Sequence, residues 1–308
     1  MNSTGIALKE PPIRYSYPIE IRCAGKTDVG RIRSINQDHF LIADLHKNMH
    51  VRQTSVTTDQ PDLYGRTLGK MLLVADGMGG ANAGEVASEM AVRSIAEYLL
   101  NSMHWLFLPT QEEIQNFVKD LKRAANHSHV AVKTDADEHP DRRGMGTTLT
   151  VAYLVWPMLY VLHVGDSRCY ILRDGKLQLL TKDQTLAQVL YDQGHLDEDD
   201  FQKSPYHHVL VNAIGAEAEL EAVVYKAKLR EGDRLLLCSD GVNAHLSDDE
   251  IETILKEEDS PQATCRRLVE TTNNEGGSDN ITSVVAFCES LDDYDEVVSE
   301  PKSNERQA

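Results

Sequence analysis

The stretch LLVADGMGGANAGEVAS, from Leu72 to Ser88, joins two kinds of secondary structure. It begins as an apolar run typical of a buried strand and ends with the spacing of an amphipathic helix. Asp76 lies at the junction, among four glycines: Gly77, Gly79, Gly80 and Gly84. A single Asp-Gly pair is usually only a turn, but a carboxylate at the edge of an apolar core is costly unless it is paired or coordinated.

These glycines do not form a nucleotide-binding loop. Gly79 and Gly84 have the spacing of a phosphate-binding P-loop, but Glu85 stands where that loop needs a lysine. The dinucleotide-binding fingerprint fails as well, because Asn82 takes the place of its third glycine.

Composition excludes several classes of protein. The chain has 308 residues, of which 41% are hydrophobic, and its net charge of −18 disfavours nucleic acid as a partner. The longest apolar run, residues 151–164, is too short to span a bilayer, and no signal-peptide pattern opens the sequence. None of the cysteines forms a CxxC pair, which predicts free thiols in a reducing compartment. Together with the short apolar run, this predicts a cytoplasmic protein without a membrane segment. The five cysteines are Cys23, Cys169, Cys238, Cys265 and Cys288.

Short β-rich runs predict strands joined by tight turns. The runs are MLLVAD, TLTVAYLV, MLYVLHVG, CYILR, KLQLLT, RLLLCS and NITSVVAF. Asp174-Gly175 predicts a hairpin turn, and Trp156-Pro157 predicts a second turn between two strands. Neighbouring strands should therefore pair antiparallel.

Helices are predicted in pairs between groups of strands. Amphipathic spacing marks residues 85–103, and capping boxes at 110–113 and 247–250 open two more helices. A last helix should begin at Ser260-Pro261 and stop near Gly276-Gly277. This order favours an α+β fold, with two antiparallel sheets back to back and helices outside.

The chain between its two ends is expected to form one unit. Residues 1–20 resemble an extended arm, and residues 289–308 have the composition of an acidic, disordered tail. Between them, residues 21–288 contain no dividing linker. Residues 46–70 are longer than a tight hairpin needs and are interpreted as an inserted loop.

Aspartate recurs where apolar runs meet loops, at Asp38, Asp76, Asp166, Asp240 and Asp279. Nearby basic residues, Arg33 and Arg168, are too few to neutralise them, and converging carboxylates raise one another's pKa values. A pair of divalent metal ions removes this difficulty, and oxygen-only ligands select Mg²⁺ or Mn²⁺ over zinc.

The remaining residues of this pattern suit attack on a phosphate ester. Gly77 has no Cβ, so its carbonyl can approach an ion closely while Asp76 bridges two ions. Two ions acidify a water and aim it at phosphorus. The planar fork of Arg33 matches two phosphate oxygens, so Arg33 is the expected phosphate-binding residue.

Six motifs occur in an order that resembles the metal-dependent protein serine/threonine phosphatases of type 2C, particularly the bacterial members. The motifs are RxxNxD (33–38), DGMGG (76–80), GMGTT (144–148), VGDSR (164–168), SDG (239–241) and SDNIT (278–282). The resemblance covers about residues 21–288. It implies a four-layer αββα fold: a central antiparallel β-sandwich flanked by pairs of helices, with a bimetal site at one edge.

The resemblance also implies roles for individual residues. Asp76 would bridge two Mn²⁺ or Mg²⁺ ions, with the Gly77 carbonyl, Asp240 and Asp279 completing their ligands, and Asp166 would bind a third ion. Asp38 would support metal-bound water, and Arg33 would bind the substrate phosphate. Residues 188–214 would form a flap beside the site.

The implied reaction is hydrolysis of phosphoserine or phosphothreonine in proteins, by in-line attack of a metal-bridging water. The implied partners are phosphorylated proteins and a serine/threonine kinase or its targets, in signal transduction, with the chain expected to act as a monomer. Neither nucleic acid nor a membrane is an expected partner.

The sequence departs from the family pattern at Met78, at Gln37 and in the long segment 46–70, and the first two departures bear on the chemistry. Met78 replaces a histidine that protonates the leaving oxygen in some relatives, so no general acid is assigned. Gln37 stands where many relatives have glutamate. His163 lies in an apolar run, where a structural histidine is expected more often than a catalytic one.

Two alternative functions stay open at this stage. A catalytically silent interaction module would usually have lost one of the metal aspartates, and none is lost here. A hydrolase of small phosphate esters would keep the metals, although the open mouth expected of short strand-end loops argues mildly against it.

Overall fold

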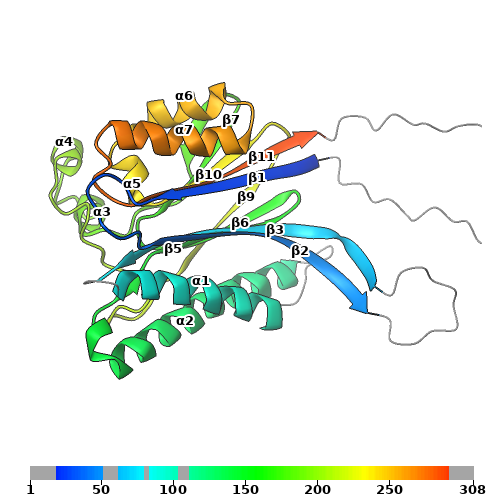
Figure 1. Cartoon of the computed structure of the whole chain (residues 1–308), viewed down its shortest axis with the longest axis horizontal. Coiled ribbons are helices and arrows are strands. Elements are labelled where there is room, and N and C mark those ends of the chain that lie inside the picture. The colour runs from blue at the N-terminus through cyan, green and yellow to red at the C-terminus, as the bar shows by residue number, and fades with distance from the viewer. Residues whose placement is uncertain (1–18, 51–61, 80–82, 103–110, 291–308) are drawn as a thin grey trace, which may run out of the picture.

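The protein folds into two antiparallel sheets packed face to face (Figure 1). The computed structural model describes residues 19–50, 62–79, 83–102 and 111–290. One sheet has the spatial order β1 (Ile19–Asp28), β11 (Ile281–Ser290), β10 (Arg234–Cys238), β7 (Arg168–Arg173), β8 (Lys176–Leu179). The other has the order β2 (Asp38–His50), β3 (Asp62–Met78), β5 (Leu149–Val155), β6 (Met158–Val164), β9 (Val223–Lys228), and the short β4 (Gly146–Thr147) pairs with the end of β3.

Helices cover the outer faces of both sheets, as Figure 1 shows. The pair α1 (Ala83–Ser102) and α2 (Gln111–Glu138) lies on the β2–β9 sheet, and α6 (Asp248–Glu257) and α7 (Pro261–Asn274) lie on the β1–β8 sheet. Short segments gather at one end of the molecule: the 3₁₀ turn Pro140–Arg142, α3 (Leu186–Asp192), α4 (Glu198–Gln202) and α5 (Asp240–Asn243). The predicted α+β fold with an antiparallel sandwich and flanking helix pairs is confirmed.

The apolar run before Asp76 explains why the layers stack in this way. Leu72 and Val74 point into the core between the sheets, whereas Leu73 and Ala75 pack in the core beneath α1 and α2. All four side chains are fully buried, because a strand covered on both faces needs apolar residues at every position. A third core lies between the other sheet and α6 and α7.

The predicted local signals have their expected structural effects. Asp174 and Gly175 both have positive φ angles, 51° and 73°, as a two-residue turn between right-twisted strands requires. Ser247 and Glu250 form a reciprocal capping box at the start of α6. The five cysteines are free thiols, and all except Cys23 are buried. Among the described helices, none combines the length and the apolar character needed to cross a membrane.

The predicted bounds of the inserted loop, the N-terminal arm and the C-terminal tail need correction where the structure describes them. The inserted loop over residues 46–70 is wrong at its ends, because β2 and β3 stay paired as far as His50 and Asp62. Two register shifts between Leu45 and Asn48 let this pairing continue where a plain alternating pattern ends. The sheet also includes residues 19–20 and 289–290, which had been assigned to the arm and the tail. Residues 51–61, the rest of the arm and tail, and the Thr110 cap lie outside the described residues.

Candidate metal centre

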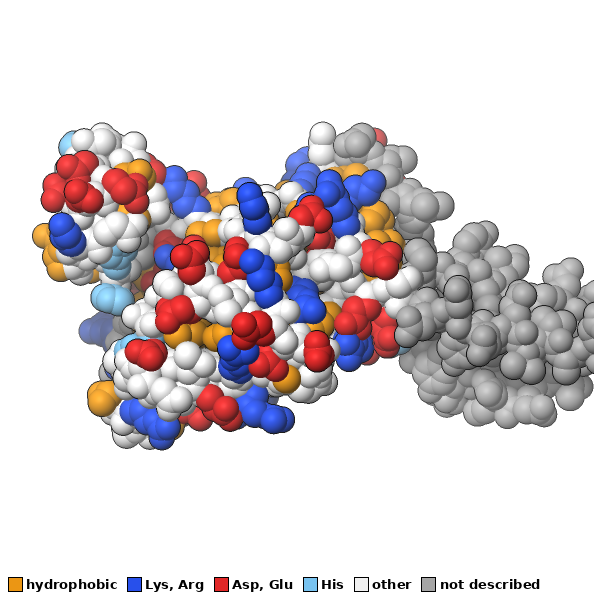
Figure 2. All heavy atoms as spheres, turned by 90° about the horizontal axis from the view of Figure 1, so that it is seen from above, with side chains coloured by type: hydrophobic (Ala, Val, Ile, Leu, Met, Phe, Trp, Pro, Cys, Tyr) orange, Lys and Arg blue, Asp and Glu red, His pale blue; other side chains and the backbone are white. Residues whose placement is uncertain are grey.

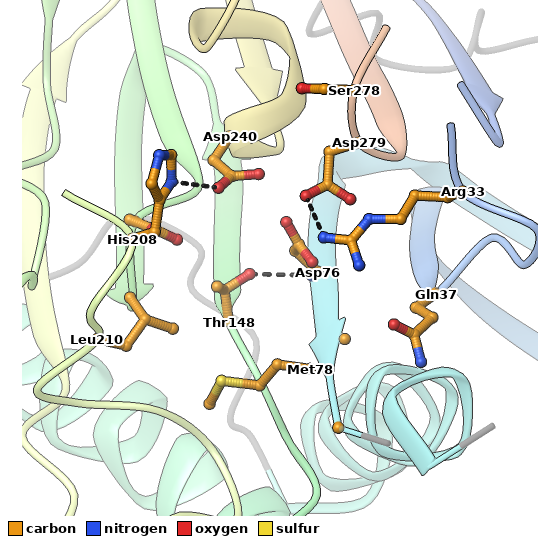
Figure 3. Close-up of a pocket in the computed structure, with 13 residues that line it drawn as sticks. Arg33, Gln37, Asp76, Met78, Thr148, His208, Leu210, Asp240, Ser278 and Asp279 are labelled. Atoms are coloured by element: carbon orange, nitrogen blue, oxygen red, sulfur yellow. Dashed lines mark hydrogen bonds and ion pairs between the residues drawn. The ribbon is translucent and has the colours of Figure 1, made fainter. Parts of the chain in front are cut away.

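A cavity of about 430 Å³ opens at one edge of the sandwich, where loops from both sheets meet. Four of the five predicted aspartates line it: Asp76, Asp166, Asp240 and Asp279. Arg33 and Gly77 line it as well, and Figure 3 shows the Arg33 head facing Asp279 and Asp76. The structure thus brings together residues that are more than 200 positions apart in sequence.

Asp76 is fixed by its own backbone. Its N–H donates to the Thr148 hydroxyl at 2.9 Å. Its carbonyl accepts from the Thr148 N–H at 2.9 Å and from the Thr147 hydroxyl at 2.8 Å. The carboxylate is therefore free to face the cavity. Burial, reinforced by the charge of the neighbouring aspartates, raises the pKa of Asp76 well above its ordinary value.

Gly77 is required by the packing of the helix that follows. A Cβ at this position would lie 2.0 Å from the carbonyl oxygen of Gly84, in the first turn of α1. The Gly77 N–H donates to the Gln37 carbonyl at 3.1 Å. The glycine therefore lets α1 begin directly against the end of β3, a reason that the sequence did not reveal.

Asp38 lies behind the cavity, opposite Asp76 in the pairing of β2 with β3. Its side chain is buried, and its Oδ2 accepts from the Ser239 hydroxyl at 2.7 Å. Its Oδ1 has no hydrogen-bond partner among the described residues. Burial raises the pKa of Asp38 to about 7. A buried oxygen without a partner indicates that a polar group from outside the chain belongs next to it.

The other three aspartates follow or precede strands of the two sheets. Asp166 follows β6 and is 7% exposed, and burial raises its pKa, with the charge of Asp240 acting in the same direction. Asp240 begins α5 immediately after β10. Asp279 precedes β11, next to Asn280.

Only two cationic groups of the described residues contact these carboxylates in the cavity. Arg33 donates from Nη2 to Asp279 Oδ2 at 2.8 Å, and this bond raises the pKa of Arg33. His208 Nδ1 lies 3.8 Å from Asp240 Oδ2, and the nearby Asp240 carboxylate raises the pKa of His208. Arg168 faces elsewhere, because its guanidinium binds both carboxylate oxygens of Asp183.

The loop that carries Arg33 is held by Asn280. The Asn280 amide donates to the carbonyls of Val29 and Ile35, each at 2.9 Å, and its oxygen accepts from the Gln37 N–H at 2.8 Å. These bonds fix the loop at both of its ends. The Arg33 side chain is 54% exposed, so its guanidinium can contact a ligand in the cavity.

His208 was not predicted as a site residue. It belongs to residues 188–214, the predicted flap, which contributes both His208 and Leu210 to the cavity wall (Figure 3). The only signal in the sequence was the polar run Tyr206-His207-His208 inside that segment, which does not show which side chain faces the cavity.

The two departures within the motifs, Met78 and Gln37, and the candidate proton donor His163 have clear positions. Met78 and Gln37 both line the cavity, and neither of them can serve as a proton donor of the histidine kind. His163 is fully buried outside the cavity, between Thr150 and the Lys182 carbonyl, and burial lowers its pKa to about 4. These contacts agree with the prediction that His163 does not act as a proton donor in the cavity.

The donor set fits hard divalent cations. It consists of carboxylate oxygens and the Gly77 carbonyl, which Mg²⁺ and Mn²⁺ accept readily. No three acidic, histidine or cysteine side chains of the described residues are already arranged to hold one ion. Burial and the charge of neighbouring carboxylates raise the pKa values of Asp38, Asp76 and Asp166, and Asp38 keeps an unpartnered oxygen, so this group of residues suits a cation.

Comparison with known proteins gives a consistent result. The family model described as protein phosphatase 2C matches residues 48–286. The serine/threonine phosphatase stp of Listeria welshimeri is 34% identical over 257 residues, which cover 83% of this chain and 92% of that protein. The serine/threonine protein phosphatase PstP of Mycobacterium tuberculosis is 36% identical over 234 residues, or 75% of this chain. The chain matches only 42% of the length of PstP.

Solved structures agree with this relationship. A crystal structure of M. tuberculosis PstP superposes with a TM-score of 0.71 at 32% identity, covering 87% of this chain and 99% of that one. The catalytic domain of PstP in complex with two manganese ions gives a TM-score of 0.68 at 31% identity, covering 88% and 99%. The sequence motifs, the fold and the residues matched agree, and this chain belongs to the protein phosphatase 2C family.

Proposed function

We propose that this protein is a metal-dependent phosphatase that hydrolyses phosphoserine and phosphothreonine in proteins. One observation carries the proposal: four aspartates of both sheets line one cavity together with Arg33. The named activities of its relatives, serine/threonine phosphatase in each case, support the same reaction.

Several of the residues that line the cavity are proposed metal ligands. Asp76, Asp240, Asp279 and the Gly77 carbonyl are the proposed ligands of two Mn²⁺ or Mg²⁺ ions, and Asp166 is the proposed ligand of a third. When bound, such ions supply Lewis-acid chemistry, polarising phosphoryl oxygens and acidifying water. The PstP catalytic domain with two manganese ions supports this assignment.

Arg33 is the proposed phosphate-binding residue. Its guanidinium has a fixed donor geometry, and it is held beside the cavity by its bond to Asp279. A phosphate seated there would accept from the remaining N–H groups of the fork. Asp38 would act from behind Asp76, where its unpartnered oxygen orients a polar group between the strand end and the reacting phosphate.

The name of the relative PstP, serine/threonine protein phosphatase, supports a protein as the substrate. Figure 2 shows acidic and basic side chains interspersed over one face, and the net charge is −18. We therefore propose phosphorylated proteins as partners, together with the kinase that modifies them, and not nucleic acid or a membrane. The free, buried thiols support a cytoplasmic location, and we propose a monomer as the active form.

The test is release of phosphate from a phosphothreonine peptide with and without Mn²⁺. We expect release that requires the metal and is abolished by chelation. The variant Asp240→Asn keeps the shape of the side chain but removes a ligand charge, so it should lower kcat/KM by about a hundredfold or more.

Asp248→Asn is the matched control, because Asp248 is an aspartate at the start of α6 whose carboxylate accepts from the Tyr170 hydroxyl, away from the cavity. It should retain wild-type kcat/KM. Full activity of Asp240→Asn, or phosphate release that persists in EDTA, would contradict the proposal.

A further inference from the structure

The metal centre is backed by a buried line of hydroxyl and imidazole groups. We call it the hydroxyl–imidazole chain, and its members are Thr148, Ser167, Thr150 and His163. Each of the four side chains is at most 2% exposed. None of them is accounted for by the proposed reaction, apart from the backbone bonds of Thr148 to Asp76.

The first half of this chain joins two of the proposed ligands. Thr148 Oγ1 accepts from the Asp76 N–H at 2.9 Å and lies 2.7 Å from Ser167 Oγ. Ser167 directly follows Asp166. The two hydroxyls therefore tie the strand end that carries Asp76 to the loop that carries Asp166.

The second half connects that loop to His163. The Thr150 hydroxyl donates to the Ser167 carbonyl at 2.9 Å and lies 3.0 Å from His163 Nδ1. On the other side of the ring, His163 Nε2 lies 3.0 Å from the Lys182 carbonyl.

The protonation of the imidazole follows from these partners. A carbonyl oxygen can only accept, so Nε2 carries the proton and donates to Lys182. In a neutral ring Nδ1 is then an acceptor. The Thr150 hydroxyl can therefore donate its one proton to Nδ1 or to the Ser167 carbonyl, which both lie within hydrogen-bond distance. This arrangement fixes the Thr150 hydroxyl between two acceptors, and it needs the geometry of a histidine.

The imidazole also anchors the segment from which the flap begins. The residues next to Lys182 make parallel contacts with the Asp166 loop: Gln184 Oε1 accepts from the Gly165 N–H at 2.7 Å, and the Gln184 N–H donates to the Gly165 carbonyl at 2.9 Å. Gly165 has a φ angle of 100°, so the loop turns sharply between these bonds.

We propose that His163 is a positioning residue of the metal centre, which acts through Thr150 on the loop that carries Asp166 and on the strand end that carries Asp76. This inference rests on the proposed function, because it assumes that these aspartates bind ions. Groups behind metal ligands typically change metal affinity or activity by about 10- to 100-fold when removed.

The experiment measures the affinity of the purified full chain for Mn²⁺ by calorimetry, together with thermal unfolding and the kinetics of phosphopeptide hydrolysis. Thr150→Val removes the hydroxyl and keeps the side-chain shape, whereas Thr150→Ser keeps the hydroxyl. Thr264→Val is the matched control, because Thr264 is a fully buried threonine whose hydroxyl donates to the Ser260 carbonyl, on the far side of the β1–β8 sheet.

We expect Thr150→Val to weaken Mn²⁺ binding about tenfold and to lower kcat with little change in KM, since the phosphate-binding arginine is untouched. Thr150→Ser should restore the affinity to within about twofold of wild type. Thr264→Val should lower the unfolding temperature without changing the affinity.

If Thr150→Val does not fold, His163→Gln is the second variant, because its amide keeps a donor for Lys182 but withdraws from Thr150. A folded variant of either kind with wild-type Mn²⁺ affinity and wild-type kcat overturns the inference and leaves the proposed function intact. Failure of the wild-type protein itself to bind Mn²⁺ overturns both.

Discussion

At the scale of single residues, the cavity is a place where negative charge exceeds what the protein itself neutralises. Asp38, Asp76 and Asp166 all have raised pKa values, and burial is the largest cause for each. Arg33 and His208 approach only Asp279 and Asp240. This imbalance would be a defect in a purely structural site, and it becomes a requirement once cations bind.

Arg33→Lys should separate charge from geometry. Lysine keeps the positive charge but cannot donate two parallel hydrogen bonds, each worth about 1.5–3 kcal/mol with a charged partner. We expect kcat/KM for a phosphopeptide to fall about ten- to hundredfold, measured by steady-state phosphate release. Arg31→Lys, an exposed arginine two residues away that does not line the cavity, should match wild type. Equal activity of the two variants would remove Arg33 from phosphate binding.

His163 should make stability depend on pH in the acidic range. Its pKa is about 4 in the folded protein and 6.5 ordinarily, so the unfolded chain binds the extra proton first. The contribution of His163 to the free energy of unfolding is fully present above pH 6.5. It is lost as the pH falls towards 4, and the loss amounts to about 3 kcal/mol. Denaturant unfolding at pH 7, 6, 5 and 4 should show a flatter pH dependence in His163→Gln than in wild type.

The control for this measurement is His195→Gln, a substitution of an exposed histidine. It should keep the wild-type pH dependence. If His163→Gln kept it too, the imidazole would not be held neutral in the folded state.

Sequence reasoning found the aspartates because they recur where apolar runs meet loops, and four of them stand beside a small or turn-forming residue: Gly77, Ser167, Gly241 or Asn280. His208 follows no such rule, since it lies in a segment without apolar periodicity and its approach to Asp240 depends on how that segment folds back. The hydroxyl–imidazole chain was missed for a similar reason. Thr150 and His163 lie on β5 and β6, Thr148 and Ser167 lie in the loops beside these strands, and the pairing of β5 with β6 brings them together.

At the scale of secondary-structure elements, the junction of β3 with α1 matters most. Gly77→Ala would place a Cβ 2.0 Å from the Gly84 carbonyl, so the start of α1 must shift away from the strand. We expect a loss of about 2 kcal/mol or more in the free energy of unfolding and a weaker Mn²⁺ affinity. Denaturant unfolding and calorimetry provide the two measurements.

Gly194→Ala serves as the comparison, because nothing lies within 4 Å of its added Cβ and only its φ angle of 72° opposes the change. It should lose about 1 kcal/mol and keep the Mn²⁺ affinity. A Gly77→Ala protein as stable as wild type would show that α1 tolerates displacement.

The observed ends of helices and strands agree with the prediction where a capping or turn motif marks them in the sequence. The Ser247 capping box, the Ser260-Pro261 start and the Asp174-Gly175 turn all have the predicted effect. The extension of β2 and β3 was missed because its pairing includes two register shifts, and a shift of one residue destroys the alternation by which a strand is recognised. Irregular strands are therefore the part of this fold that sequence patterns show least.

At the scale of the whole molecule, the proposed ligands join the two sheets. Asp76 lies near the end of β3 and Asp166 follows β6, both in the β2–β9 sheet, whereas Asp240 and Asp279 adjoin β10 and β11 in the other. The Ser239–Asp38 hydrogen bond also crosses between the sheets. Ion binding at this edge is therefore expected to strengthen the contact between the two halves.

Mn²⁺ should raise the unfolding temperature of the protein. A ligand that binds only the folded state at 100 times its Kd adds about 2.7 kcal/mol, and chelation should reverse the effect. Differential scanning calorimetry with MnCl₂, with EDTA and with CaCl₂ as a comparison cation measures it. Asp240→Asn should show a smaller shift than wild type, and an identical shift would mean that the ion binds elsewhere.

The pairing of β1 with β11 has a practical consequence. Ile19 lies opposite Ser290, so the first and last described residues leave the sandwich side by side, at the end remote from α3 and α5 (Figure 1). A fluorescent protein or an immobilisation tag joined at Ile19 or at Ser290 would leave the sandwich at that end. Tethering the protein there to a bead or a sensor surface should leave the cavity turned outward, where the proposed phosphoprotein substrates could reach it.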